Sequence, residues 1–112
     1  MPSDRDPRSA PQFEQKHLRE RLVIVQVRGE LDMGSADALR RALDEAEASE
    51  VDVVRVDASE VAFLDSAALG VILGCAQRMN ARGGRLELVC ESPAIRRVLD
   101  MTMISRTVHV LP

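Results

Sequence analysis

Aromatic side chains are almost missing from this sequence of 112 residues, which has two phenylalanines, no tryptophan and no tyrosine. Proteins that bind single-stranded nucleic acid stack the bases on aromatic side chains, so this chain has little material for such a surface. The formal net charge of -3 also argues against a surface that neutralises phosphates. We therefore expect no direct contact with nucleic acid.

Long apolar runs are also missing. A transmembrane helix needs about 20 apolar residues, and Asp65 and Ser66 interrupt the longest run here. The beginning of the chain lacks the basic and then apolar pattern of a signal peptide. We expect a cytoplasmic protein with no membrane insertion.

Cysteine is scarce too. Cys75 and Cys90 are too few for a disulfide scaffold, and neither a CxxC pair nor a histidine cluster indicates a metal site. We expect two reduced thiols and no metal or other cofactor. The alternative is a redox-switched disulfide, which requires the two Cα atoms to lie within about 7 Å.

What the chain does contain is a regular alternation of strand-like and helix-like segments. Residues 1–11 are polar and rich in proline, which indicates a disordered lead-in before a single domain at 12–112. The strand-like segments are 13–21, 22–27, 51–56, 85–90 and 107–111, and we expect 22–27 to be buried on nearly both faces. The alternation predicts an α/β fold with a mixed, largely parallel sheet of about five strands, layered with helices.

Three helices are expected between these strands. Ser35 is the expected N-cap of the first, and Ser92 followed by Pro93 is typical of the start of the third. The second belongs to the stretch Val61–Gly84, where an apolar arm leads into Asp65-Ser66 and then into a helix-period segment that ends at a glycine pair. Asp57-Ala58-Ser59 is expected as a turn before that arm.

Ser66 would stand at the start of a helix beside the carboxylate of Asp65. The simplest interpretation is a helix cap. A second is phosphorylation, because a phosphate is tolerated at a helix N-terminus and adds close to two negative charges there. A third is a nucleophile, which needs a base within hydrogen-bond reach; only His17 and His109 are available, and the G-x-S-x-G pattern is absent.

Several stretches occur in the order and spacing of a known family. They are Gly29-Glu30-Leu31-Asp32, the string FLDSAALGVILG at 63–74, Gly83-Gly84, Ser92-Pro93 and Leu99-Asp100-Met101. Together they resemble the landmarks of STAS domains, and especially those of bacterial anti-sigma factor antagonists. The resemblance extends from about Phe13 to the end of the chain and implies a protein with no catalytic residues and no enzymatic activity.

The resemblance also implies a partner switch. In this family the unphosphorylated protein binds an anti-sigma factor that is also a serine kinase, and so frees a sigma factor; phosphorylation of the serine after the aspartate prevents this binding, and a phosphoserine phosphatase restores it. Here that serine is Ser66. The docking surface implied for a partner comprises Asp32, Asp65, Ser66, Ala67, Ala68 and Gly70.

The chain departs from the family pattern at one place. The usual string D-S-[S/A/T]-G-[L/I/V]-G has glycine where this chain has Ala68, so we expect a methyl group where the backbone of a partner approaches. Two other functions are kept beside the first: a STAS module that binds its partner regardless of phosphorylation, in a signalling or transporter-associated complex, and a small hydrolase that uses Ser66.

Overall fold

The structure is a computed structural model that describes residues 20–112, so the expected lead-in at 1–11 lies outside it, as does nearly all of the strand expected at 13–21. The elements are β1 (Leu22–Leu31), α2 (Met33–Ala48), β2 (Val53–Leu64), α3 (Ser66–Ala81), β3 (Arg85–Val89), α4 (Pro93–Met101), a short 3-10 helix η1 (Ile104–Arg106) and β4 (His109–Val110).

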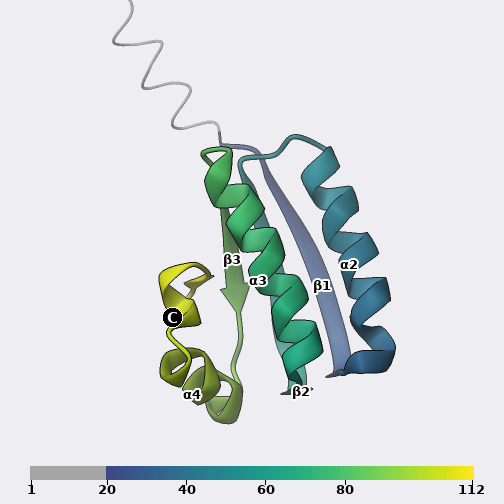
Figure 1. Cartoon of the computed structure of the whole chain (residues 1–112), viewed down its shortest axis with the longest axis vertical. Coiled ribbons are helices and arrows are strands. Elements are labelled where there is room, and N and C mark those ends of the chain that lie inside the picture. Colours follow the sequence, from purple (N-terminus) through teal and green to yellow (C-terminus); the bar gives the residue numbers. More distant parts are fainter. Residues whose placement is uncertain (1–19) are drawn as a thin grey trace, which may run out of the picture.

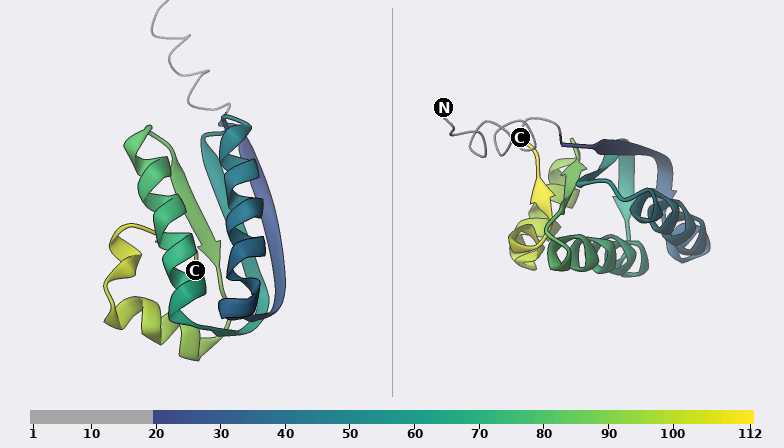
Figure 2. Two further views of the ribbon diagram at one scale, coloured as in Figure 1. Left: turned by 45° about the vertical axis from the view of Figure 1, so that its right-hand side comes forward. Right: turned by 90° about the horizontal axis from the view of Figure 1, so that it is seen from above.

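The sheet of the described residues has four strands in the order β1-β2-β3-β4, and every neighbouring pair is parallel. The predicted α/β class with a largely parallel sheet is confirmed, with four strands in residues 20–112 where about five were expected for the chain. Helices α2 and α3 lie side by side on one face of the sheet (Figures 1 and 2). Helix α4 lies past the carboxyl end of β3 (Figure 1) and contacts β2 and η1, and η1 contacts β4.

The core fills the space between the sheet and these helices. Its fully buried side chains come from the central strands and from α2, α3 and α4: Leu43, Val54, Val56, Ile72, Met79, Leu86, Leu88 and Leu99. The other face of the sheet is different at β1, where Leu22 and Ile24 are 43% and 51% exposed. The expectation that the strand at 22–27 is buried on nearly both faces is therefore wrong, because within residues 20–112 helices cover only one face of it (Figure 2).

Strand β2 is longer than the sequence predicted. No turn separates residues 51–56 from the arm at 61–64; instead one strand runs through both, with two shifts of register against β1. At the first shift Gln26 pairs with Asp57 and then Arg28 with Glu60, so β2 carries an extra residue. The Asp57 carboxylate accepts a hydrogen bond from the Ser59 backbone there. The turn-forming residues thus make a β-bulge and not a chain reversal.

A charged network crosses the sheet face opposite α2 and α3. Glu87, 4% exposed, accepts hydrogen bonds from Arg55 Nε at 2.8 Å and from Arg85 Nε at 2.9 Å. Arg85 also binds the Glu20 carboxylate through both terminal nitrogens, at 2.8 and 3.1 Å. Burial alone would raise the pKa of Glu87, but the bonds from Arg85 and Arg55 outweigh it and hold the pKa below its usual value. Glu87 is therefore a satisfied, buried carboxylate.

Candidate functional site

The turn between β2 and α3 presents Ser66 to solvent. Asp65 is the N-cap of α3, and its Oδ1 accepts the Ala68 backbone N–H at 3.0 Å. Ser66 is then the first helical residue and is exposed; among residues 20–112 its hydroxyl has no hydrogen-bond partner. Because Asp65 caps this helix, the hydroxyl of Ser66 is not needed for the cap.

A second helix begins next to this turn. Asp32 is the N-cap of α2, so the prediction of Ser35 as the cap is wrong by three residues. Asp32 Oδ1 accepts the Ser35 N–H at 3.2 Å, while Ser35 Oγ accepts the Asp32 N–H at 3.0 Å. The two residues form a reciprocal capping box, with serine in the third helical position.

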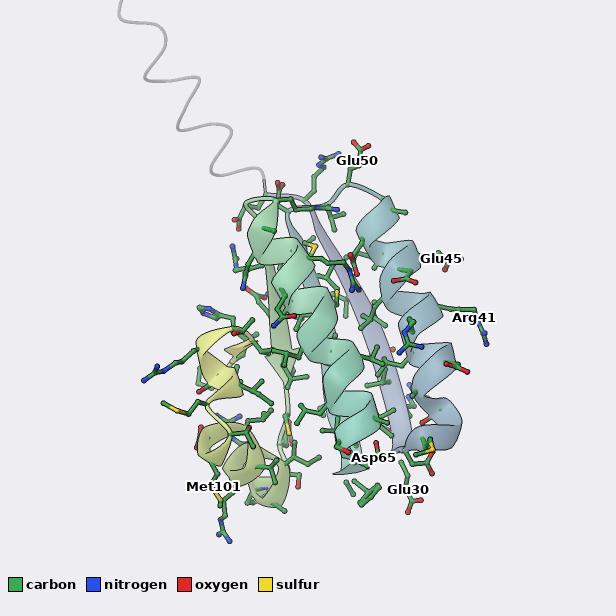
Figure 3. All side chains as sticks on the ribbon, in the orientation of Figure 1. Glu30, Arg41, Glu45, Glu50, Asp65 and Met101 are labelled. Atoms are coloured by element: carbon green, nitrogen blue, oxygen red, sulfur yellow. The ribbon has the colours of Figure 1, made fainter. Side chains whose placement is uncertain are left out.

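Pairing of β1 with β2 brings the two turns together. Glu30 pairs with Phe63 and Leu31 with Leu64, and beyond the last pair the Asp65 N–H donates to the Leu31 carbonyl at 2.9 Å. Figure 3 shows Glu30 and Asp65 at one end of the molecule, with Glu50 at the other. The site thus lies at the carboxyl ends of parallel strands, where open α/β sheets bind their ligands.

The other expected docking residues differ in how far a partner could reach them. Gly70 is exposed, one turn after Ser66 on the same side of α3, and nothing lies within 4 Å of where a Cβ would be. Ala67 is half-buried. Ala68 is completely buried in the core cluster. The methyl group that distinguishes Ala68 from the usual glycine therefore packs inside the domain.

Two large apolar side chains at this end were not singled out by the sequence. Met33, the first residue of α2, is 78% exposed, and Phe63, near the end of β2, is 49% exposed. Phe63 belongs to an apolar run, and such a run predicts buried side chains. Its exposure follows the second register shift in β2, which falls between the pair Gly29–Val61 and the pair Glu30–Phe63. No signal in a single sequence locates that shift.

A base for a serine hydrolase is absent from the part of the chain that the structure describes. His109 pairs with Glu87, which pairs with Arg55, nine residues before the end of β2. At about 3.3 Å per residue, nine residues of strand span roughly 30 Å from the level of His109 to the end of β2, beyond which Ser66 lies. His17 lies outside the described residues. The hydrolase interpretation has no geometric support in residues 20–112.

The two cysteines are both buried and free. Burial raises the pKa of the Cys75 thiol to about 12, and its hydrogen bond with the Glu47 carboxylate acts in the same direction. Cys90 Sγ points toward the Ser92 carbonyl at 3.9 Å. Cys75 is thus a weakly reactive thiol at neutral pH.

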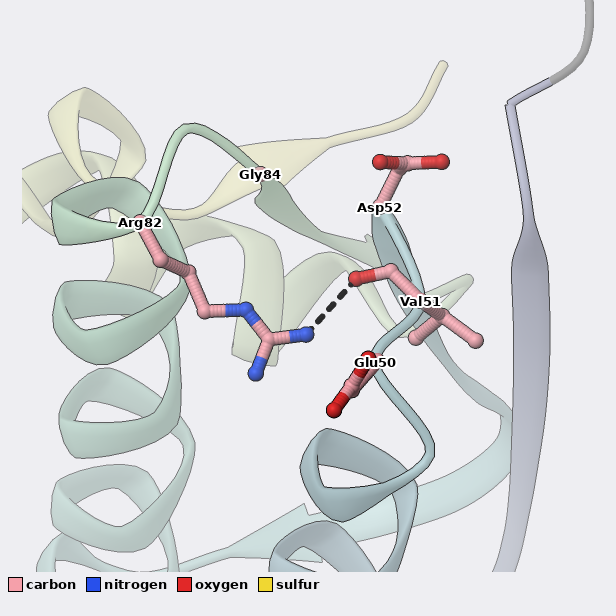
Figure 4. A pocket seen from close by; sticks show the side chains of 5 residues that line it. All are labelled: Glu50, Val51, Asp52, Arg82 and Gly84. Carbon is pink, nitrogen blue, oxygen red and sulfur yellow. Dashed lines mark hydrogen bonds between the residues drawn. The ribbon is translucent and has the colours of Figure 1, made fainter.

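A polar pocket lies at the opposite end of the sheet from Ser66 (Figure 4). Its wall includes Arg82, which donates to the carbonyls of Glu47 at 3.0 Å and Val51 at 2.8 Å and so ties α3 to the loop after α2. Gly84 forms another part of the wall, and a Cβ there would come within 2.5 Å of the Asp52 carbonyl oxygen. The residues of this pocket thus hold the end of α3 against the loop before β2, which is a structural role.

Membrane-spanning and metal-binding features are both absent from residues 20–112. These residues contain no helix of the length and apolarity that crossing a bilayer requires. They also contain no group of three or more histidine, cysteine, aspartate or glutamate side chains placed to hold a metal ion.

Known proteins resemble this chain over most of its length. The family model of the STAS domain matches residues 14–112. The anti-sigma F factor antagonist of Paenibacillus polymyxa is 35% identical over 92 residues, which are 81% of this chain and 78% of that protein.

Solved structures agree with this. The crystal structure of an anti-sigma factor antagonist from Mycobacterium paratuberculosis superposes with a TM-score of 0.73 at 30% identity, covering 81% of this chain and 77% of the other. The Bacillus protein SpoIIAA in its phosphorylated form gives a TM-score of 0.65 at 23% identity, over 85% and 86% of the two chains, which is a likeness of fold. From the family model and these relatives, the chain belongs to the STAS domain family and is similar in sequence to its anti-sigma factor antagonists.

Proposed function

We propose that this chain is an anti-sigma factor antagonist. In its unphosphorylated form it binds an anti-sigma factor that has serine kinase activity, which releases a sigma factor; phosphorylation of Ser66 ends the binding, and a phosphoserine phosphatase resets the switch. The proposal includes a cytoplasmic location, a single domain at 12–112 and no enzymatic activity of the chain itself.

The observation that carries the proposal is the environment of Ser66. An exposed hydroxyl with no partner among the described residues is accessible to a kinase. The neighbouring amide of Ala68 already binds Asp65 Oδ1, so the cap of α3 does not depend on Ser66. Phosphorylation can therefore change the surface without removing the contact that begins the helix.

A phosphate at Ser66 would act at the docking surface itself. It carries about -1.5 to -2 charges at neutral pH and three strong acceptor oxygens. The helix N-terminus tolerates the group in the free protein. A partner packed closely over Ser66 and Gly70 would have to strip water from this dianion, and burying an unpaired charge is costly. Binding would then fail while the fold persists.

The experiment is a comparison of what wild-type protein, Ser66→Asp and Ser66→Ala capture from a lysate of the host, with bound proteins identified by mass spectrometry. We expect wild type and Ser66→Ala to retain an anti-sigma factor and Ser66→Asp to lose it. Ser105→Asp is the matched control, because Ser105 is an exposed serine in η1.

The covalent step is tested separately. The captured anti-sigma factor, incubated with labelled ATP, should phosphorylate wild type but not Ser66→Ala. If wild type and Ser66→Asp bind the same partner equally, and no label enters the protein, control by phosphate at Ser66 is wrong for this chain. A STAS module that binds its partner regardless of phosphorylation would then explain the result.

A further inference from the structure

The end of the sheet that carries Ser66 also exposes apolar surface that the fold does not use. Met33 and Phe63, at 78% and 49% exposure, are far more exposed than side chains of the core. Exposed apolar side chains grouped beside a functional site are typical of protein contacts. A partner protein surface that covers both side chains would account for their exposure.

Contacts already described bring the segments that carry these two side chains to the same end of the sheet. Phe63 pairs across the sheet with Glu30, and Met33 follows the cap of α2. The bond from Asp65 N to Leu31 O joins the end of β2 to the end of β1 between them. Phe63 and Met33 thus belong to the segments that carry the two capping aspartates, Asp65 and Asp32.

The unpaired charge around these side chains has one sign. Asp37 is neutralised by Arg40 at 3.1 Å. Glu30, Asp32 and Asp65 have no ion-pair partner among residues 20–112. An acidic surface attracts a basic one, which speeds encounter and sets orientation more than it adds affinity. The complementary partner surface is basic and has an apolar recess.

We propose that Phe63 and Met33 are the apolar anchors of the contact with the anti-sigma factor, and that the anti-sigma factor presents basic side chains around an apolar recess that receives them. This inference rests on the proposed function and names the chemistry of its partner surface. Anchors of this kind, at the centre of an interface, carry a large share of the binding free energy. The acidic side chains around them guide the approach.

The exposed carboxylates and a phosphate at Ser66 should affect binding in two different ways, which salt can distinguish. Loss of an exposed carboxylate such as Glu30 should weaken binding at low ionic strength and matter little at high salt, since salt screens exposed charges. A phosphate at Ser66 acts by the cost of removing its water in a close contact, which salt screens much less. A basic partner and inhibition by phosphate are therefore compatible.

The test is a titration calorimetry series with the purified anti-sigma factor of the host. Phe63→Thr removes the ring and keeps a residue that suits a strand, and Ile24→Thr is its control, with 51% exposure on β1. Ile24 is level with Arg55, eight residues before Phe63 on β2. Met33→Gln tests the second anchor with a side chain of similar length.

We expect Phe63→Thr to raise the dissociation constant at least tenfold and Met33→Gln severalfold, with Ile24→Thr within twofold of wild type. Glu30→Gln should weaken binding at low salt only, and Glu45→Gln, on α2 away from this end (Figure 3), should not. Equal effects of Phe63→Thr and Ile24→Thr overturn the inference and leave the proposed function standing. Failure of wild type to bind any anti-sigma factor overturns the proposed function itself.

Discussion

Gly84 illustrates how one residue can be fixed by its neighbours. A Cβ at this position would lie 2.5 Å from the Asp52 carbonyl oxygen and 3.0 Å from Met79 Cε. The first of these atoms is backbone and cannot rotate away. Gly84 also donates its N–H to the Met79 carbonyl at 2.8 Å, which ends α3. The residue therefore sits where the chain leaves a helix and passes directly against the loop before β2.

We predict that Gly84→Ala lowers the free energy of unfolding by about 1–3 kcal/mol, because added volume in a closely packed place forces shifts of this cost. Urea unfolding followed by circular dichroism measures it. Gly70→Ala is the control: nothing lies within 4 Å of the position that its new methyl group would take, and alanine in a helix gains about 0.5–1 kcal/mol over glycine. The same substitution should thus have opposite signs at the two sites.

Individual residues also mark where prediction from the sequence succeeded and failed. The exposure of Ser66 beside Asp65 follows from placing Asp-Ser between a strand and a helix. The burial of Ala68 does not, because the third residue of a helix can face either way until the position of the sheet is known. The cap of α2 was misplaced because Asp32 and Ser35 are both good caps, and sequence alone does not rank them.

At the scale of the element, Asp65 begins α3 and also belongs to the proposed docking surface. Its Oδ1 satisfies the Ala68 N–H, and its backbone N–H reaches β1. Removing the side chain would therefore disturb folding and binding together. Asparagine separates the two roles, since it caps helices about as well as aspartate but has no charge.

We predict that Asp65→Ala lowers the free energy of unfolding by about 1 kcal/mol, the usual cost of losing a cap, whereas Asp65→Asn changes it by less than half as much. Chemical denaturation of the three proteins gives the answer. Equal losses for alanine and asparagine would show that the charge, and not the hydrogen bond to Ala68, stabilises the start of α3.

Strand β2 is the element whose length was predicted least well from the sequence. Asp57-Ala58-Ser59 has the composition of a turn, yet the chain continues as a strand with a bulge. Local propensity favours the turn, while pairing with β1 before and after the bulge, at Asp57 and at Glu60, favours the strand. The helices were predicted better, since their 3.6-residue periodicity and their end signals are local.

At the scale of the whole molecule, acid should destabilise the fold through its paired carboxylates. The hydrogen bond from Arg78 lowers the pKa of Glu47, and those from Arg85 and Arg55 lower that of Glu87 against the effect of burial. Each group has a lower pKa folded than unfolded. The stability it contributes is thus fully present above the unfolded value of about 4.3 and is lost as the pH falls through the folded value.

We predict that the free energy of unfolding is nearly constant from pH 7 to about pH 5 and decreases below it. Glu87→Gln should cost about 1–3 kcal/mol at pH 7, because it leaves Arg55 and Arg85 without their carboxylate, and the difference from wild type should shrink toward about pH 3. Urea unfolding at several pH values measures both. A cost that stays the same throughout this range would contradict the role of the Glu87 charge.

The parallel sheet has a consequence for how occupation of the site could be detected. The bond from Asp65 to Leu31 exists only when β1 and β2 are paired, so the unfolded chain offers no partner this surface. A ligand that binds the native state alone raises its stability by mass action, by about 2.7 kcal/mol at a hundred times its dissociation constant. The melting temperature of the domain is therefore itself a measure of how much of the protein is bound.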